Sequence, residues 1–464
     1  MKQKITISVR ELAEYTHRSG DLNLEAFTSS SRAVTGIRVH QKIQKSRPEE
    51  YQKEVFVSWQ IETENFQVEI KGRIDGVFVY PDKIIIEEIK TTDRNLDSLQ
   101  KKENPVHWAQ AKIYAYIYAS KDCLETIDIR LTYFHLESKE IKEITKTFSI
   151  KELEGFFQTL FQKYLVWMKR LFDYRNLRDE TIRKLDFPFE KYRPGQRKMA
   201  MEVYRNIRDS GQLIVQASTG IGKTAAVLFP AIKTFPEKHS TKIFYLTPKT
   251  TGKEAAEKSF QKMKEKGLNF TFLTLTAKDK ICPNPENACN GEECSFARGF
   301  YDRIDAALND IFQENSLTRE IVEKYSQTHK VCPFEFSLAI SLWSDCIICD
   351  YNYAFDPRIY LRRFFDEENL KKDDRFVFLI DEAHNLVDRA RSMFSADLYK
   401  KNILEIRKEI KEKLPEIYKN LGKTNSWLLK MRKQSEESGG YFNEDELTEE
   451  LIPILRKFLK STEK

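Results

Sequence analysis

The sequence from Leu213 to Phe229 reads Leu213-Ile-Val-Gln-Ala217-Ser-Thr-Gly-Ile-Gly-Lys-Thr224-Ala-Ala-Val-Leu-Phe229. This order predicts a short apolar strand, a glycine-containing loop and a helix. Glycines in such a loop let backbone amides face a phosphate group, and the helix start adds the positive end of its dipole. A lysine there reaches the terminal phosphates, and the threonine after it ligates magnesium. The stretch therefore predicts a parallel α/β domain that binds nucleotide through Thr219, Gly220, Gly222, Lys223 and Thr224.

A second motif, Phe376-Val-Phe-Leu-Ile-Asp381-Glu-Ala-His384, supplies acidic residues at the end of an apolar strand. We expect Asp381 to hold magnesium through water and Glu382 to polarise the water that attacks the γ-phosphate. His384 is expected to couple the nucleotide site to nucleic acid. Because Ala217 stands where the usual loop motif has glycine, a glycine turn without a ligand is the alternative interpretation of the loop.

The composition is that of a folded protein. Hydrophobic residues make up 41% of the 464 residues, charged residues 32% and aromatic residues 12%. At roughly 150 residues per domain, this length predicts about three compact units. No apolar run approaches the roughly 18 to 20 residues that cross a bilayer, and the start lacks a signal peptide, so we expect a cytoplasmic protein without a membrane partner. Lys plus Arg number 77 and Asp plus Glu 71, a net charge of +6 that mildly favours a polyanionic partner.

The patterns predict an α/β multidomain protein. Residues 1–178 mix helical and strand patterns as in an α+β domain, with a helical start, and the charged residues 173–186 predict a linker. Strands and helices then alternate over residues 179–281 and 336–396, around a cysteine-containing insertion at 282–335. Apolar residues at three- and four-residue steps predict a helical segment over residues 397–464.

The motifs of the second region resemble those of superfamily-two helicases of the XPD-like and DinG-like group. The resemblance covers about residues 187 to 390 and rests, besides the two motifs above, on Phe187-Pro-Phe-Glu-Lys-Tyr-Arg-Pro-Gly-Gln196, Tyr245-Leu-Thr-Pro-Lys-Thr-Thr251 and Asp350-Tyr-Asn-Tyr-Ala-Phe-Asp-Pro357. It implies a RecA-like motor that binds Mg-ATP, with Gln196 reading the adenine base. It also implies 5′-to-3′ movement on single-stranded or forked DNA.

Four cysteines have the spacing Cys282-x6-Cys289-x4-Cys294-x37-Cys332 inside the insertion. Four thiolates can bind zinc or an iron–sulfur cluster, and ligand count does not choose between them. The resemblance implies a 4Fe-4S cluster at this position. Cys346 and Cys349 fall in an apolar strand pattern that points them to opposite faces, so they are expected to be core thiols, and Cys123 is assigned no role.

In the first region, Lys71-Gly-Arg-Ile-Asp75-Gly-Val-Phe-Val-Tyr80 and Lys83-Ile-Ile-Ile-Glu-Glu-Ile-Lys90 predict a tight hairpin. Strand alternation places Glu88 and Lys90 on one face and Glu87 on the other. Pairing Tyr80 with Lys83 would set Asp75 opposite Glu88. Two carboxylates and an ammonium suit hydrolysis of a phosphodiester with Mg²⁺ or Mn²⁺, and a surface salt-bridge set uses the same residue types.

Asp75 followed by Glu88-x-Lys90 resembles PD-(D/E)XK nucleases, and two further features resemble their RecB-like branch. Thr35-Gly-Ile-Arg-Val-His40 is similar to that branch's upstream histidine segment, which implies His40 as a further metal ligand. Gln110-x-x-x-Tyr114 is similar to its helical motif. The resemblance implies a restriction-endonuclease-like fold in which Asp75, Glu88 and Lys90 are catalytic.

Together the resemblances imply an ATP-dependent DNA helicase with metal-dependent nuclease activity, acting in DNA repair or recombination. Two alternatives stay open: a DNA- and ATP-binding module without productive unwinding, and nuclease activity alone. The Q-x-x-G-R-x-x-R motif of the second RecA-like domain is absent, and the helical segment after Leu398 resembles the start of an arch domain. We therefore expect this chain to hydrolyse ATP poorly and not to unwind DNA. Its oligomeric state is not predicted.

Overall fold

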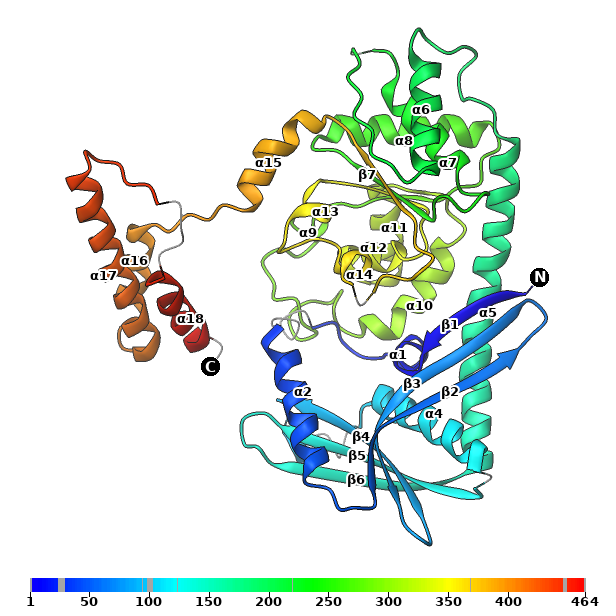
Figure 1. The fold of residues 1–464 in the computed structure, drawn as a ribbon, viewed down its shortest axis with the longest axis vertical. Coiled ribbons are helices and arrows are strands. Elements are labelled where there is room, and N and C mark those ends of the chain that lie inside the picture. The colour runs from blue at the N-terminus through cyan, green and yellow to red at the C-terminus, as the bar shows by residue number, and fades with distance from the viewer. Residues whose placement is uncertain are drawn as a thin grey trace. The chain divides into compact units, whose positions relative to one another are not determined.

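The computed structural model describes residues 2–23, 30–93, 95–97, 103–122, 124–218, 220–367, 369–444 and 449–462. Cys123 and Thr219 lie outside the described residues. The chain divides into one unit of residues 1–354 and 359–385, which holds two β-sheets, and a second unit of residues 355–358 and 386–464. Figure 1 labels the elements of both units.

The N-terminal sheet has six strands in the order β1-β3-β4-β5-β6, with β2 paired to β3. Parallel and antiparallel pairs mix within it, as expected for an α+β domain. The predicted helical start is wrong at its first residues, because these pair with β3 as a parallel strand before α1 begins. The elements are β1 (Gln3–Ser8), α1 (Val9–His17), α2 (Ser30–Lys45), β2 (Tyr51–Glu62), β3 (Phe66–Val79), β4 (Ile84–Thr92), α4 (Pro105–Asp122), β5 (Thr126–His135), β6 (Ile141–Ser149) and α5 (Ile150–Lys184).

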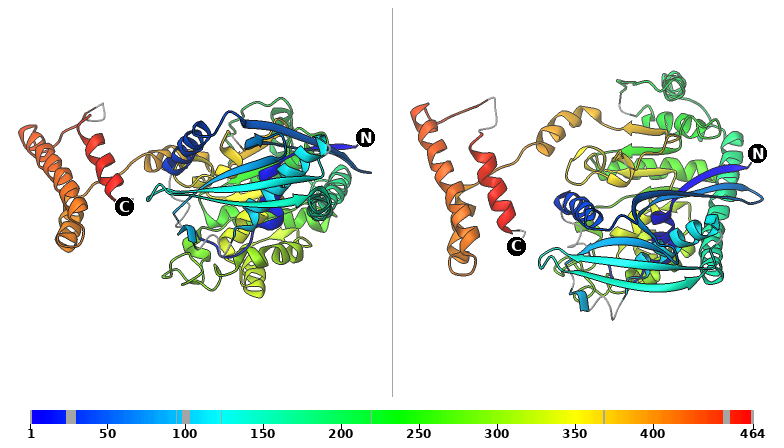
Figure 2. Two further views of the ribbon diagram at one scale, coloured as in Figure 1. Left: turned by 90° about the horizontal axis from the view of Figure 1, so that it is seen from below. Right: turned by 60° about the horizontal axis from the view of Figure 1, so that its bottom comes forward.

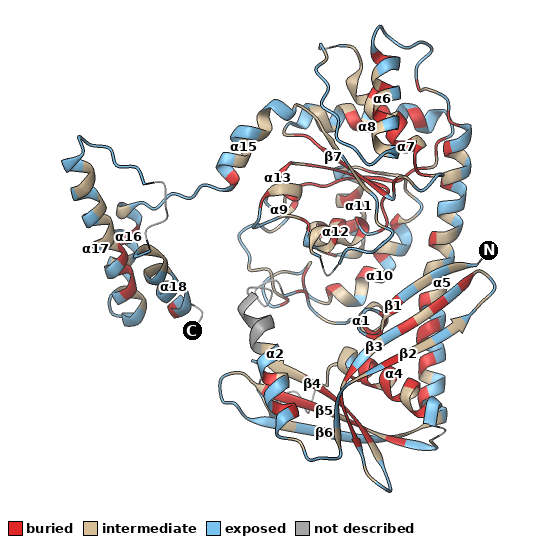
Figure 3. Cartoon of the chain, viewed as in Figure 1, coloured by how far each residue is buried: buried red, intermediate tan, exposed pale blue. Residues whose placement is uncertain are grey.

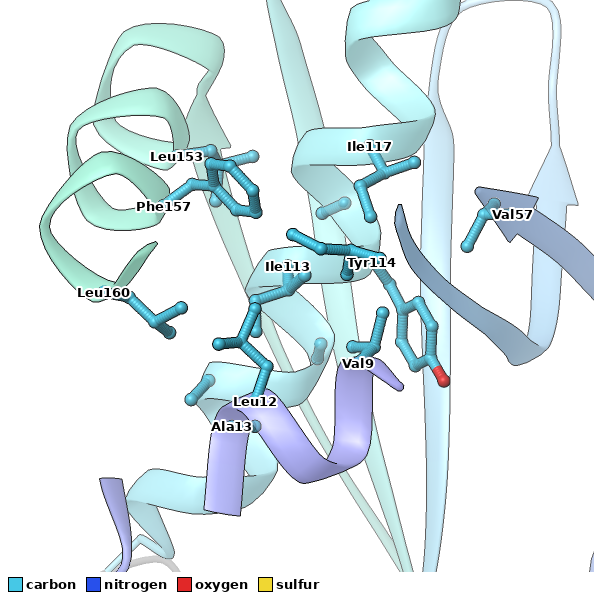
Figure 4. Close-up of a cluster of buried hydrophobic side chains, with 14 of the residues drawn as sticks. Val9, Leu12, Ala13, Val57, Ile113, Tyr114, Ile117, Leu153, Phe157 and Leu160 are labelled. Atoms are coloured by element: carbon cyan, nitrogen blue, oxygen red, sulfur yellow. The ribbon is translucent and has the colours of Figure 1, made fainter. Parts of the chain in front are cut away.

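Helices α1, α4 and α5 cover one face of this sheet. Leu12 of α1, Ile113 of α4 and Phe157 of α5 meet in one buried apolar cluster, shown in Figure 4. Figure 3 shows that burial is densest in β4, β5 and α4. Burying each large apolar side chain contributes about 1.5–3 kcal/mol, so this cluster fixes β4, the strand that carries Glu88 and Lys90.

The predicted linker at residues 173–186 is wrong, because α5 runs unbroken through it to Lys184. Figure 1 shows α5 as one continuous helix, and the left view of Figure 2 looks nearly along its axis. Its polar residues have partners in the second sheet: Arg178 donates to Asp345 at 2.6 Å, and the Tyr174 hydroxyl donates to the same carboxylate. Residue 178, the predicted end of the first domain, therefore lies inside a helix that contacts both sheets.

The second sheet is parallel throughout, in the order β11-β7-β10-β8-β9, as the alternating pattern predicted. Its strands are β7 (Lys242–Leu246), β8 (Phe272–Thr274), β9 (Ser316–Leu317), β10 (Cys346–Cys349) and β11 (Phe376–Ile380). Its helices are α6 (Gln196–Arg208), α7 (Lys223–Lys233), α8 (Thr250–Glu265), α13 (Asn352–Phe355) and α14 (Arg362–Phe365). Cys346 and Cys349 are fully buried in β10, which confirms that they are core thiols.

The predicted strand at residues 213–216 is wrong. Among the residues that the structure describes, no strand pairs with this segment, and Ile214 is 97% exposed. The sheet ends at β11, whose free edge is paired with no strand of the residues that the structure describes.

The insertion contains α10 (Phe300–Ile311) and α11 (Arg319–His329). Just before it lies α9 (Lys278–Ile281), and α12 (Pro333–Ile340) begins at its end; the four helices share an apolar core. The second unit is helical, as predicted. After η2 (Ala383–Asn385) in the first unit, it contains α15 (Leu386–Met393), α16 (Lys400–Ile410), α17 (Pro415–Glu437) and α18 (Leu451–Thr462). No described helix combines the length and apolar character that a membrane span requires.

Candidate functional sites

The β3–β4 hairpin has the predicted register. Gly76 pairs with Glu87 and Val79 with Ile84, and the Tyr80 amide donates to the Lys83 carbonyl at 3.0 Å. Continued by one residue, this register sets Asp75 opposite Glu88. The Asp75 Oδ2 accepts a hydrogen bond from the Ile89 amide at 2.7 Å, which fixes its carboxylate beside the strand that carries Glu88.

Glu88 is a buried carboxylate with one satisfied oxygen. Its side chain is 2% exposed, and Lys90 Nζ lies 2.6 Å from Oε1. The other oxygen, Oε2, is buried and has no hydrogen-bond partner. Burial raises the pKa of Glu88 to about 7, and the opposing charge of Lys90 only partly offsets that rise. The site therefore holds a carboxylate that ionises near neutral pH, with one oxygen free to bind a ligand.

His40, on α2, faces the same group: its Nδ1 lies 3.5 Å from Asp75 Oδ1. Burial lowers the pKa of His40, but the hydrogen bond and charge of Asp75 outweigh burial, and the pKa is raised overall. The structure thus brings His40 beside Asp75, as the sequence predicted.

Gln110 and Tyr114 lie one turn apart on α4, and both are buried. Gln110 Oε1 accepts a hydrogen bond from Lys90 Nζ at 3.2 Å, so it orients the ammonium. Burial and the nearby Glu88 charge raise the pKa of Tyr114. The Tyr114 ring lies against Gly72 of β3, where an added Cβ would come 2.7 Å from the hydroxyl.

Two polar residues near this site were not predicted. Gln44 of α2 donates to the Asp75 carbonyl at 2.9 Å and so ties α2 to β3. Arg47 binds Glu87, which also accepts from Thr132 at 2.6 Å. Glu87 is therefore occupied on the opposite face, as strand alternation predicted. Single glutamine and arginine residues without a motif gave no signal for these contacts.

In the nucleotide loop, Gly220 and Gly222 both have a positive φ, 85° and 79°. Gly222 caps α7, and Lys223 Nζ reaches across the loop to the Ala217 carbonyl at 3.2 Å. Gln196 is buried and bonds main chain with both ends of its amide: Nε2 donates to the Gly222 carbonyl at 3.1 Å, and Oε1 accepts from the Arg193 amide at 2.9 Å. The Arg193 guanidinium also donates to the Gly220 carbonyl. The segment that ends at Gln196 is thus joined to the loop by hydrogen bonds.

Asp381 follows β11 and lies beside this loop. Its amide donates to the Leu246 carbonyl at 2.8 Å, and its Oδ2 lies 3.4 Å from Thr247 Oγ1. The buried Tyr245 hydroxyl interacts with both Thr224 and Asp381, and its pKa is raised by burial and by the Asp381 charge. Tyr245 therefore connects the two halves of the site, a role that the sequence did not predict.

Glu382 and His384 stand at the exposed edge of the same site. Glu382 has a φ of 53°, in the left-handed region, and its carbonyl accepts from Asn385 Nδ2 at 3.0 Å. His384 Nδ1 lies 3.5 Å from Glu382 Oε2, and the His384 side chain is 72% exposed. An exposed imidazole next to the acidic residue is accessible to a macromolecular ligand.

The four insertion cysteines line one small cavity. Lys278 hydrogen-bonds to Cys289, and burial raises the pKa of Cys332 to about 11. Among the described residues, no three His, Cys, Asp or Glu side chains stand so that they could hold one metal ion together. That the cysteines ligate a metal or a cluster therefore stays a prediction, which their shared cavity does not test.

Comparison with known proteins agrees with this arrangement. Family models match residues 8–208 (PD-(D/E)XK nuclease superfamily), 193–318 (DEAD/DEAH box helicase) and 268–403 (DEAD_2). The regulator of telomere elongation helicase 1 homolog of Caenorhabditis elegans is 24% identical over 271 residues, 49% of this chain and 27% of that protein. The ATP-dependent DNA helicase XPD of Sulfolobus acidocaldarius is 28% identical over 199 residues, 42% of this chain and 33% of that protein.

Among solved structures, an XPD helicase has 21% identity and a TM-score of 0.37, covering 59% of this chain and 47% of its own. The chain spans about a third or less of the length of the curated relatives that it matches, with 36% as the largest share among those compared. The fold is α/β, with a mixed six-stranded sheet and a parallel five-stranded sheet. Residues 8–208 match the PD-(D/E)XK nuclease superfamily model and residues within 193–403 match the two helicase models, and each match covers less than half of the chain.

Proposed function

We propose that the chain is an ATP-dependent DNA helicase/nuclease of DNA repair or recombination, with a working phosphodiesterase site in its N-terminal domain. The observation that carries the nuclease is the unpartnered buried Oε2 of Glu88, because a buried carboxylate oxygen costs free energy unless something binds it. It stands opposite Asp75 and beside Lys90, so a divalent cation fits the donor set.

In this proposal binding of Mg²⁺ or Mn²⁺ draws His40, Asp75 and Glu88 together as ligands, since without the ion no three described His, Cys, Asp or Glu side chains stand so that they could hold one. A bound ion would supply Lewis-acid activation of the phosphate and of the attacking water. Lys90, oriented by Gln110, orients that water and stabilises negative charge on the reacting phosphate. Tyr114 packs against Gly72 and excludes solvent from the buried side of the carboxylates.

A cleavage assay tests the nuclease. Single-stranded and duplex DNA are incubated with the chain and Mn²⁺, and Lys90→Ala is compared with Lys83→Ala. Lys83 is exposed and belongs to the same hairpin, outside the carboxylate group. We expect Lys90→Ala to lose roughly 100-fold or more in rate, and Lys83→Ala to cleave normally. Cleavage that survives Lys90→Ala rejects the site.

We further propose that Gly220, Gly222, Lys223 and Thr224 bind the phosphates of Mg-ATP, with Thr219 in the same loop. Asp381 binds magnesium through water, Glu382 activates the attacking water, and His384 contacts DNA. Fluorescent-nucleotide titration of Lys223→Ala against Lys198→Ala tests this site, since Lys198 is exposed on α6. Unchanged affinity in Lys223→Ala rejects it.

A second candidate function is a module that binds DNA and ATP without productive unwinding. The observation that favours it is that His384 and Glu382 stand at an exposed edge, where DNA can reach them. The measurement that separates the two is ATP hydrolysis with and without single-stranded DNA. Stimulated turnover with strand separation supports the motor, and binding without turnover supports the module.

For the insertion, we propose that Cys282, Cys289, Cys294 and Cys332 ligate a 4Fe-4S cluster. All four cysteines line one cavity, and four thiolates are the ligand set of such a cluster. A bound cluster would order the insertion, which in turn lies beside DNA in the proposed motor. A brown protein whose colour and iron disappear in Cys332→Ser supports this, and a colourless protein that contains zinc rejects it.

A further inference from the structure

A segment of the nuclease domain, residues 18–22, lies against the cysteine insertion; we call it the junction segment. It follows α1 in the dark blue part of Figure 1. Four hydrogen bonds join it to residues 297–302. Its own amides donate at two of them: Gly20 to Asp302 Oδ1 at 2.9 Å, and Leu22 to the Ala297 carbonyl at 2.9 Å. It accepts the other two, since the Tyr301 amide donates to the Gly20 carbonyl at 3.0 Å and the Gly299 amide donates to Asp21 Oδ1 at 2.6 Å.

The start of the segment is also held by a side chain. Arg18 Nη2 donates to the Tyr301 hydroxyl at 2.7 Å, and its guanidinium lies 4.0 Å from the centre of the Tyr301 ring. Main-chain hydrogen bonds in both directions, reinforced by a cation–π contact, make this a built interface rather than a chance approach.

The end of the segment reaches the cysteine cavity itself. Leu22 is 1% exposed and lines the same cavity as the four insertion cysteines. Asp21 lies against Gly291, where an added Cβ would come 2.1 Å from Asp21 Oδ2. Gly291 lies between Cys289 and Cys294 in the chain. Asp21 of the nuclease domain therefore contacts the loop that carries two of the expected ligands.

We propose that the nuclease domain supplies one wall of the cysteine site, and that ligation by the cysteines in turn fixes the junction segment. The inference rests on the proposed 4Fe-4S site. Ligated Cys289 and Cys294 hold their loop in one conformation, and Asp21 and Leu22 pack on that loop. Without ligation the loop gains conformational freedom, so the junction hydrogen bonds open more often. Leu22 and Asp21 are positioning residues, because they act through the loop that carries Cys289 and Cys294.

The first test measures how long the cluster lasts. Chain purified without oxygen is exposed to air or to an iron chelator, and the loss of visible absorbance and of bound iron is timed. Leu22→Ala is compared with Leu317→Ala, the same change in the same apolar core but outside the cavity lining. We expect Leu22→Ala to lose iron roughly tenfold faster than the unmodified chain, and Leu317→Ala to stay within about twofold of it.

The second test does not depend on iron chemistry in the variant. Hydrogen exchange is measured on the unmodified chain and on Cys332→Ser. The amides of Leu22, Gly299 and Tyr301, which donate across the junction, should exchange roughly tenfold faster in Cys332→Ser, while those of β5 keep their rates.

The outcomes separate this inference from the proposed cluster. If the unmodified chain holds no iron, the cluster proposal fails and this inference fails with it. In the other case the unmodified chain holds iron, Leu22→Ala retains iron as long as Leu317→Ala does, and Cys332→Ser does not change the exchange rates of the junction amides. That result supports the cluster and refutes the inference that the nuclease domain forms part of the cysteine site.

Discussion

If the proposed nuclease site binds a metal ion, we expect Glu88 to make its metal affinity depend on pH near neutrality. A carboxyl group must lose its proton before it binds a metal ion. Burial raises the pKa of Glu88 from its ordinary 4.5 to about 7, and Lys90 offsets only part of that rise. Protons and metal ions therefore compete for Glu88 in the range where the enzyme would be assayed.

The size of the effect follows from this pKa. With a pKa of about 7, roughly a tenth of Glu88 is ionised at about pH 6 and roughly nine-tenths at about pH 8. The apparent affinity for Mn²⁺ should then rise about tenfold across that interval. A glutamate with an ordinary pKa would be almost fully ionised at both values, so its affinity would change by only a few per cent.

Calorimetric titration with Mn²⁺ across this pH range measures both affinity and proton release. Running each titration in two buffers of different ionisation enthalpy should show about one proton released per ion near pH 6 and close to none near pH 8. Glu88→Gln should bind weakly at every pH. An affinity that stays flat with no proton release would refute the proposed role of Glu88.

The same pKa predicts how stability changes without metal. Because the folded pKa is raised, protonated Glu88 contributes stability that is full below about pH 4.5 and is lost as pH rises through about 7. The loss amounts to about 3 kcal/mol at the upper end. Urea unfolding should show this decline in the metal-free chain, and added Mn²⁺ should stabilise most above pH 7.

Three substitutions test the packing around the sites. Gly252→Ala places a Cβ 2.0 Å from Thr247 Oγ1 and 3.0 Å from Asp381 Oδ2, so Thr247 and Asp381 must shift and we expect roughly tenfold weaker Mg-ATP binding by fluorescent-nucleotide titration. Gly72→Ala places a Cβ 2.7 Å from the Tyr114 hydroxyl and should slow DNA cleavage with little change in folding, as read by circular dichroism. Arg178→Ala removes the ion-pair partner of the buried Asp345, which keeps only neutral hydrogen-bond donors from Tyr174 and Thr271, and should cost about 3 kcal/mol in urea unfolding.

Each of these substitutions has a matched control. Gly155→Ala adds a Cβ on α5 with nothing within 4 Å and should change neither activity. Arg205→Ala removes an exposed ion pair on α6, and such pairs contribute about 0–1 kcal/mol. If Arg178→Ala costs no more than Arg205→Ala, the buried pair does not join α5 to the second sheet as described.

The nuclease hairpin could be predicted because its constraints are local. A tight turn after Tyr80 fixes the register, and alternation then decides which side Glu88, Lys90 and Glu87 take. The path of α5 could not be predicted in the same way. Its polar residues look like a linker until Asp345, far away in sequence, supplies the partner that Arg178 needs.

The segment before the nucleotide loop shows the same limit from the other side. Leu213, Ile214 and Val215 have strand propensity, but a strand also needs a neighbour with which to share hydrogen bonds. No described strand pairs with them, and all are exposed. The loop is therefore positioned from its helix side, by Gln196 and Arg193, rather than by a preceding strand.

This anchoring gives Gln196 a role that can be separated from reading the adenine base. Both ends of its amide are bonded to main chain, so Gln196→Ala should loosen the loop itself. We expect roughly tenfold weaker binding of ATP and an equal loss for inorganic tripolyphosphate, which has no base, in competition titrations with a fluorescent nucleotide. Gln196→Glu, which keeps an acceptor for the Arg193 amide but loses the donor to Gly222, should fall between. A loss for ATP that tripolyphosphate does not share would assign Gln196 to the base instead.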